Sequence, residues 1–191
     1  MTLADCVIQC DSLVAGYTSP VTPAVSFIAR PGDVLGVRGQ NGTGKSTLLL
    51  ALAGGAKVFS GHVHRPLGVE LLHHRQQWEA GEELPLTGLD VCSLTGADVA
   101  SAPDRVKRLL PSRLDQLSGG QCQLIRLWAC LGSKAKLLLL DEPTNSLDVT
   151  GIETLAQMVR QHSADRAIVL VSHESDFLDM VCSNSISLEP A

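Results

Sequence analysis

The 191-residue sequence lacks a long hydrophobic run, although 45% of its residues are hydrophobic. A membrane-spanning helix needs about 18 or more consecutive apolar residues, whereas apolar runs such as 137–140 and 167–171 have the length of a strand. The first residues also lack the basic segment followed by an apolar stretch that marks a secretory signal peptide. We therefore expect neither a spanning segment nor a secretion signal.

Positive charge is also scarce, because 15 Lys and Arg stand against 20 Asp and Glu, which gives a formal net charge of −5. Proteins that bind nucleic acid without sequence specificity neutralise its phosphates with a basic face. The charge balance therefore argues against a nucleic-acid partner. The six cysteines form no C-x-x-C pair, and this pattern is typical of reduced, mostly buried thiols in a cytosolic protein. The alternative is a metal pair formed by Cys6 and Cys10.

The length suits a single domain, residues 1–191, whose organisation changes along the chain. In the first third, short apolar runs between glycine and proline predict strands at 7–9, 25–29, 34–37, 58–64 and 69–72. A helix at about 46–53 is predicted after a glycine-rich turn. The middle predicts helices from Thr87 to about 94 and at 103–110. Beyond it, the pattern predicts helices at 119–131, 150–162 and 174–181, which alternate with apolar strands at 136–140 and 167–171. Continuous apolar strands between helices indicate an α/β fold with a parallel sheet covered on both faces, into which the helical middle is inserted.

A phosphate-binding loop is the clearest motif of the sequence. The pattern G-x-x-x-x-G-K-[ST] is matched, between a predicted strand and a predicted helix, by Gly39, Gln40, Asn41, Gly42, Thr43, Gly44, Lys45 and Ser46. Its glycines let backbone N–H groups point inward as an anion nest, and the following helix adds its positive N-terminal end. Lys45 can reach the terminal phosphates, and the Ser46 hydroxyl can ligate Mg²⁺.

Two carboxylates follow the apolar strand at 136–140. Asp141 and Glu142 are therefore expected at the carboxyl end of a parallel strand, where such sheets bind their ligands. Beside the phosphate loop, Asp141 can hold Mg²⁺, directly or through water, and Glu142 can polarise the attacking water as a general base.

A second anion-binding helix start lies at Ser118, Gly119, Gly120 and Gln121. Ser118 is a favourable helix cap, and the two glycines allow another backbone to approach closely. One nucleotide cannot easily use both helix starts of one chain. A head-to-tail dimer, in which each site takes the phosphate loop of one chain and the Ser-Gly-Gly turn of the other, satisfies both.

With these motifs in this order, the chain resembles the ATP-binding-cassette (ABC) ATPases, the nucleotide-binding subunits of ABC transporters, from about residue 13 to residue 188. Residues 39–47 resemble the Walker A loop, which adds Thr47 to the nucleotide contacts. Residues 117–121 resemble the signature, and residues 137–142 resemble Walker B. The resemblance implies a P-loop fold with an N-terminal antiparallel β subdomain and a short helical subdomain at about 76–133, inserted between core segments at about 1–75 and 134–191.

The resemblance also implies roles for four further residues. Tyr17 would stack on adenine, Asp148 in the D-loop at 145–148 would meet the partner subunit, and His173 in the switch segment would contact the γ-phosphate. Gln76 would be the Q-loop glutamine, a catalytic residue and Mg²⁺ ligand, with Gln77 as the alternative. Trp78 belongs either to the core or to the apolar groove beside the Q-loop that receives a helix of the membrane partner.

The predicted function is ATP hydrolysis that powers a transporter. The resemblance implies ATP and Mg²⁺, a second ATPase subunit (the same chain or a paralogue), a permease on a separate polypeptide and a place at the inner face of the cell membrane. Residues 84–92 look most like the corresponding piece of zinc or manganese transporter ATPases, and the short length also suits haem export. We interpret His62, His64, His73 and His74 as solvent-facing strand residues, with His62 and His64 as a metal pair in the alternative. The rival functions are a soluble ABC-type ATPase on a non-membrane assembly and a regulator that binds nucleotide without turnover.

Overall fold

The computed structural model describes residues 6–75 and 85–189, and its centre is a five-stranded parallel sheet. The strand order is β5-β6-β7-β3-β8, with every neighbouring pair parallel. The bounds of these strands are Val34–Gly39 for β3, Leu71–His74 for β5, Leu137–Asp141 for β6, Ala167–Val171 for β7 and Asn184–Leu188 for β8. The α/β fold with a parallel core sheet is thereby confirmed.

Strand β7, and β6 as far as Leu140, are apolar at every position because each face of the sheet is covered. Leu138 and Leu140 of β6 belong to one buried cluster, whereas Leu137 and Leu139 belong to a second. Side chains alternate across a strand, so a strand buried on both faces needs an apolar residue at every position. The apolar runs that predicted β6 and β7 reflect this double burial.

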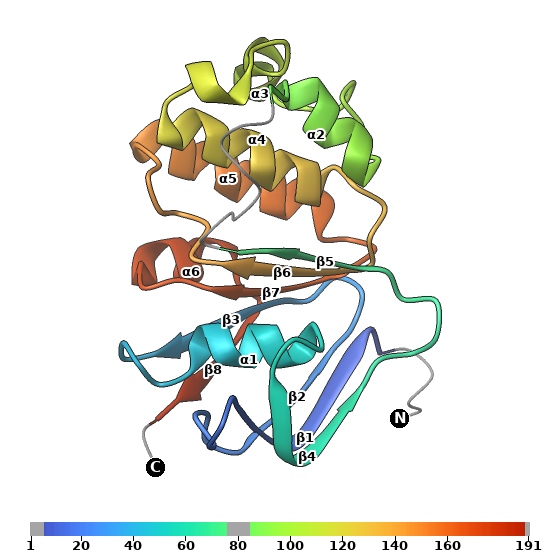
Figure 1. Ribbon diagram of the computed structural model, residues 1–191, viewed down its shortest axis with the longest axis vertical. Coiled ribbons are helices and arrows are strands. Elements are labelled where there is room, and N and C mark those ends of the chain that lie inside the picture. The colour runs from blue at the N-terminus through green and yellow to red at the C-terminus, as the bar shows by residue number, and fades with distance from the viewer. Residues whose placement is uncertain (1–5, 76–84, 190–191) are drawn as a thin grey trace.

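Helices cover one face of the sheet, and a smaller antiparallel sheet lies beyond the other (Figure 1). The helical side holds α2 (Gly88–Thr95), α3 (Asp104–Leu109), α4 (Gly119–Leu131), α5 (Val149–His162) and α6 (Ser175–Val181), with a 3₁₀ turn at Leu114–Gln116 before α4. The opposite side holds α1 (Lys45–Leu52) and the antiparallel strands β1 (Ile8–Gly16), β2 (Val25–Ala29) and β4 (Lys57–His64), in the order β2-β1-β4.

The helix predictions are confirmed to within one residue at most ends, and the strands show three corrections. The strand expected at 7–9 continues to Gly16: β1 crosses a bulge after Cys10 and stays paired with both β2 and β4. The strand expected at 69–72 lies instead at Leu71–His74, in register with Leu137–Leu140 of β6. Strand β8 was not predicted at all. It lies at the edge of the sheet and carries exposed serines, so its sequence lacks the apolar run of a central strand.

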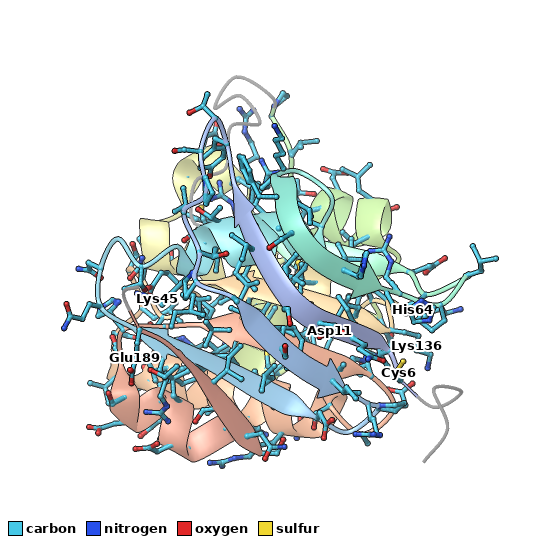
Figure 2. All side chains as sticks on the ribbon, turned by 90° about the horizontal axis from the view of Figure 1, so that it is seen from below. Cys6, Asp11, Lys45, His64, Lys136 and Glu189 are labelled. Carbon is cyan, nitrogen blue, oxygen red and sulfur yellow. The ribbon has the colours of Figure 1, made fainter. Side chains whose placement is uncertain are left out.

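The carboxyl ends of the parallel strands lie together on one side of the molecule. Figure 2 shows Lys45, which follows β3, and Glu189, which follows β8, on the same side, whereas Lys136, which precedes β6, lies on the opposite side. His64 lies on the side of Lys136. Parallel sheets bind ligands at their carboxyl ends, so the Lys45 side is where a site is expected.

Candidate functional site: a phosphate loop and two acidic strand ends

The phosphate loop connects β3 to α1 and wraps around the side chain of its own lysine. Lys45 is 7% exposed, and its Nζ donates hydrogen bonds of 2.8 Å to the carbonyl oxygens of Gly39 and Gln40. Gly44, the N-cap of α1, has φ of 89°, and a Cβ there would lie 2.9 Å from Cγ2 of Thr22. Only glycine combines this left-handed conformation with such a close neighbour. The loop therefore places a buried cation at the positive end of a helix.

Ser46 and Asp141 meet at the foot of this loop. The Ser46 hydroxyl donates a 3.0 Å hydrogen bond to Oδ1 of Asp141, the last residue of β6. Burial raises the pKa of the Asp141 carboxyl, and the hydrogen bond from Ser46 opposes that shift. A hydroxyl and a carboxylate beside a phosphate site form the kind of oxygen donor set that Mg²⁺ takes, so the two residues fit this ion.

Glu142 and His173 form the second pair, at the ends of β6 and β7. One carboxylate oxygen of Glu142 accepts a 3.2 Å hydrogen bond from the backbone N–H of His173 and lies 2.8 Å from Nδ1 of its ring. Glu142 has φ of 47°, a conformation that non-glycine residues rarely adopt. Such outliers persist only where the surroundings fix them, and they cluster at functional sites.

The phosphate loop and the Glu142–His173 pair open into one cavity of about 610 Å³. Residues predicted from the sequence that line it are Asn41, Gly42, Gly44, Lys45, Ser46, Thr47, Glu142 and His173. Gln40 and Thr43 line an adjoining cavity of about 380 Å³. Val21 and Asn145 also line the larger cavity. Sequence reasoning missed Val21, and it placed Asn145 in the D-loop without predicting that it lines the nucleotide cavity. Asn145 lies three residues after Glu142, at the start of the predicted D-loop, whereas Val21 carries no chemical signal of its own.

Tyr17 is 57% exposed and does not line either of these two cavities. Val21, four residues after Tyr17 in the chain, lines both cavities instead. The role of Tyr17 in stacking on adenine therefore stays a prediction.

The predicted signature begins α4 but does not line the 610 Å³ cavity. Ser118 is the N-cap: its hydroxyl accepts a hydrogen bond from the Gln121 amide, and the Gln121 side chain accepts one from the Ser118 amide. This reciprocal cap satisfies two amides at the helix start. Gly119 and Gly120 follow in the first turn. Asp148, in the predicted D-loop, is likewise an N-cap, and its side chain accepts a 2.7 Å hydrogen bond from the Gly151 amide at the start of α5.

The predictions for Gln76, Gln77 and Trp78 lie outside the described residues. His62 and His64 are exposed on β4. His73 is half-buried with both ring nitrogens shielded from solvent, and His74 is only 4% exposed, so the prediction that all four face solvent is wrong for His73 and His74. Within residues 6–75 and 85–189, there is no group of three or more His, Cys, Asp or Glu that could hold a metal ion. The same part of the chain contains no helix with the length and apolar character to cross a membrane.

Comparison with known proteins agrees with this geometry. Residues 23–145 match the family model described as "ABC transporter". The zinc import ATP-binding protein ZnuC of Roseobacter denitrificans is 37% identical over 177 residues, which cover 88% of this chain and 69% of that protein. The protein of the same name from Paracoccus denitrificans is 36% identical, with 85% and 67% covered. A solved ATP-binding subunit of an ABC transporter superposes with a TM-score of 0.81 at 22% identity, over 96% of this chain and 86% of that one, and shares the fold.

Proposed function

Since the chain belongs to the ABC transporter family, it is an ATP-binding subunit with ATPase activity, and we propose that it drives zinc through a separate membrane permease. The observation that carries this proposal is the cavity in which a buried lysine, a serine–aspartate pair and a glutamate–histidine pair converge. These groups are the parts that phosphoryl transfer to water needs: cations for the phosphates, oxygen ligands for a metal ion and a base for the nucleophile.

The proposed roles follow from the chemistry of each group. Lys45 and the loop amides hold the phosphates, and His173 contacts the γ-phosphate. Glu142 accepts a proton from the attacking water, and the contacts of its carboxylate with the backbone N–H and ring Nδ1 of His173 hold that carboxylate in place. Ser46 and Asp141, with Gln76, hold Mg²⁺, which when bound neutralises phosphate charge.

We further propose that two copies, or this chain and a paralogue, close head to tail over two nucleotides. In each site the turn at Ser118, Gly119, Gly120 and Gln121 of one subunit faces the phosphate loop of the other. The position of this turn outside the 610 Å³ cavity of its own chain supports a role at a neighbouring one. Asp148 meets the partner subunit, and Tyr17 stacks on adenine. The core comprises residues of about 1–75 and 134–191, and the helical subdomain comprises about 76–133.

Zinc is proposed because two relatives named for zinc import match this chain at 36–37% identity. The permease is a separate, membrane-spanning polypeptide, and binding to it places the ATPase at the cytoplasmic face of the membrane. This proposal sets aside the alternative of a non-membrane assembly, which no feature of the site favours.

The test is affinity purification of the tagged chain from detergent-solubilised membranes of its native host, followed by reconstitution of the complex in vesicles. We expect an integral-membrane protein to copurify, and ATP to drive transport of zinc in preference to manganese. The Lys45→Ala chain is the matched control, which should retain the permease but not transport. Copurification with ribosomal or other soluble assemblies, without a membrane protein, would contradict the proposal.

A further inference from the structure

An arginine outside the nucleotide cavity binds the D-loop. Nη2 of Arg105, on α3, donates hydrogen bonds of 2.9 and 3.0 Å to the two carboxylate oxygens of Asp148. Its Nη1 also donates to the hydroxyl of Thr150, in the first turn of α5. Its neighbour Val106 is completely buried in the helical cluster, which anchors α3. The guanidinium therefore ties the end of the D-loop to a fixed helix more than forty residues earlier in the chain.

The D-loop is held at a second point, by the signature helix. Ser146 has φ of 66°, and its carbonyl oxygen lies so close to Gly120 that a Cβ added there would be 2.4 Å from it. A close backbone contact of this kind leaves the loop little freedom to shift relative to α4. Residues 145–148 are thus held between the start of α4 and the side chain of Arg105.

Arg105 contributes neither to the nucleotide cavity nor to the hydrogen bond that caps α5. Arg105 does not line the 610 Å³ cavity, and the N-cap bond from the Gly151 amide to Asp148 does not use it. The Asp148 side chain is 65% exposed, so the pair contributes little to global stability. The pair matters more for the position of the D-loop than for stability. A planar guanidinium that contacts both carboxylate oxygens of Asp148 and the hydroxyl of Thr150 fixes the orientation of the D-loop relative to α3 as well as its distance from it.

We propose that Arg105 is a positioning residue, which fixes the D-loop to the helical segment so that the signature turn and the D-loop meet the second subunit as one rigid unit. The proposal rests on the proposed function, in which both segments act at the nucleotide site of the partner. Loss of Arg105 removes the link between the D-loop and α3 but leaves the contact of Ser146 with Gly120 and the N-cap bond of Asp148. The D-loop then adopts the geometry that completes the nucleotide site of the partner less often.

The experiment compares wild type with Arg105→Gln and Arg105→Lys. The matched control is Arg108→Gln, on the same helix, where the arginine side chain is exposed and forms no hydrogen bond or ion pair with another described residue. Hydrogen exchange of the D-loop amides reports on positioning without any need for turnover. Steady-state kinetics, ATP affinity and the unfolding midpoint complete the set.

We expect Arg105→Gln to speed D-loop exchange roughly two- to fivefold, as loss of an exposed ion pair allows. It should lower kcat about tenfold, because small misplacements of catalytic groups are costly, while the ATP dissociation constant and unfolding midpoint stay unchanged. Arg105→Lys keeps the charge and should recover part of kcat, and Arg108→Gln should behave as wild type.

Unchanged D-loop exchange in Arg105→Gln would overturn the proposal. So would a parallel fall of kcat, ATP affinity and unfolding midpoint, since that pattern marks a merely structural residue. A wild type without ATPase activity would instead defeat the proposed function, and the exchange measurement would still decide whether Arg105 holds the loop.

Discussion

One oxygen of Glu142 lies 3.2 Å from the backbone nitrogen and 2.8 Å from ring Nδ1 of His173. The two residues follow β6 and β7, whose parallel register pairs Asp141 with Val171 and brings the strand ends together. The left-handed backbone of Glu142 turns its carboxylate toward that neighbouring strand end. The carboxylate and the imidazole therefore face one cavity as a pair.

Replacement of this carboxylate by an amide should stop hydrolysis while ATP still binds. For Glu142→Gln we expect kcat to fall by a factor on the order of 10²–10⁴, the usual contribution of a general base. Because the phosphate contacts remain, the variant should accumulate as an ATP-bound dimer, whereas the wild type turns over. Steady-state phosphate release and light scattering after size exclusion measure both effects. Turnover by the variant within a few-fold of wild type would refute the role of Glu142.

Removal of the buried ammonium should act on binding first. Lys45→Ala removes the charge that the loop holds at 7% exposure, and each lost charge-assisted contact to a phosphate costs about 1.5–3 kcal/mol. ATP affinity should therefore fall by at least about tenfold, as calorimetry of the purified protein can measure. Lys57→Ala, at an exposed position of β4, is the control and should bind ATP as wild type does. Equal affinities of the two variants would contradict the assignment of Lys45.

The two signature glycines should differ in their effect on stability. A Cβ at Gly120 would meet the Ser146 carbonyl oxygen at 2.4 Å, whereas at Gly119 the nearest atom would lie at 3.9 Å. Gly120→Ala should therefore lower the free energy of unfolding by about 1–3 kcal/mol, the usual range for overpacking. Gly119→Ala should leave it unchanged or raise it by up to about 1 kcal/mol through helix propensity. Urea titrations without nucleotide measure this difference in the free energy of unfolding. Equal effects of the two substitutions would show that the D-loop backbone moves away from Gly120 at little energetic cost.

Buried histidine should make the protein less stable as the pH falls below neutrality. Burial, with the nearby charge of Arg126, lowers the pKa of His74 to about 4, and burial with Arg75 lowers the pKa of His73 to about 4. Between pH 6.5 and pH 4 the unfolded chain binds protons that the folded chain does not. Stability is thus lost on acidification through this window, by up to about 1.4 kcal/mol per pH unit for His74 and by less for the half-buried His73, and the loss levels off below pH 4.

A variant isolates the contribution of His74. Because His74 shares the face of β5 with Leu72, which packs on the helical cluster, His74→Leu should fold and should show a shallower pH dependence of the urea midpoint between pH 7 and pH 5. His64→Gln, at an exposed position, should follow the wild-type curve. Parallel curves for wild type and His74→Leu would show that His74 is not buried as a neutral ring.

Local sequence was enough to predict the central strands and the helices beside the site. Residues 167–171 were predicted with the bounds of β7, because a strand buried on both faces has to be apolar throughout. The helix at 119–131 was predicted with its cap at Ser118, since that cap is a local interaction. Strand β8 was not predicted, because an edge strand with alternating serines has a composition that is also typical of a turn.

The sequence by itself determined the chemistry of this protein: which residues carry a cation, a carboxylate, a hydroxyl or a helix start, and in which order. Those features are local, because they depend on residue type and on spacing within a few positions. Only the tertiary structure decided which of them meet. The pairing of β6 with β7 brings Glu142 to His173, and the packing of α3 against the other helices brings Arg105 to Asp148. Such pairs depend on contacts between segments far apart in the chain, which no local pattern encodes.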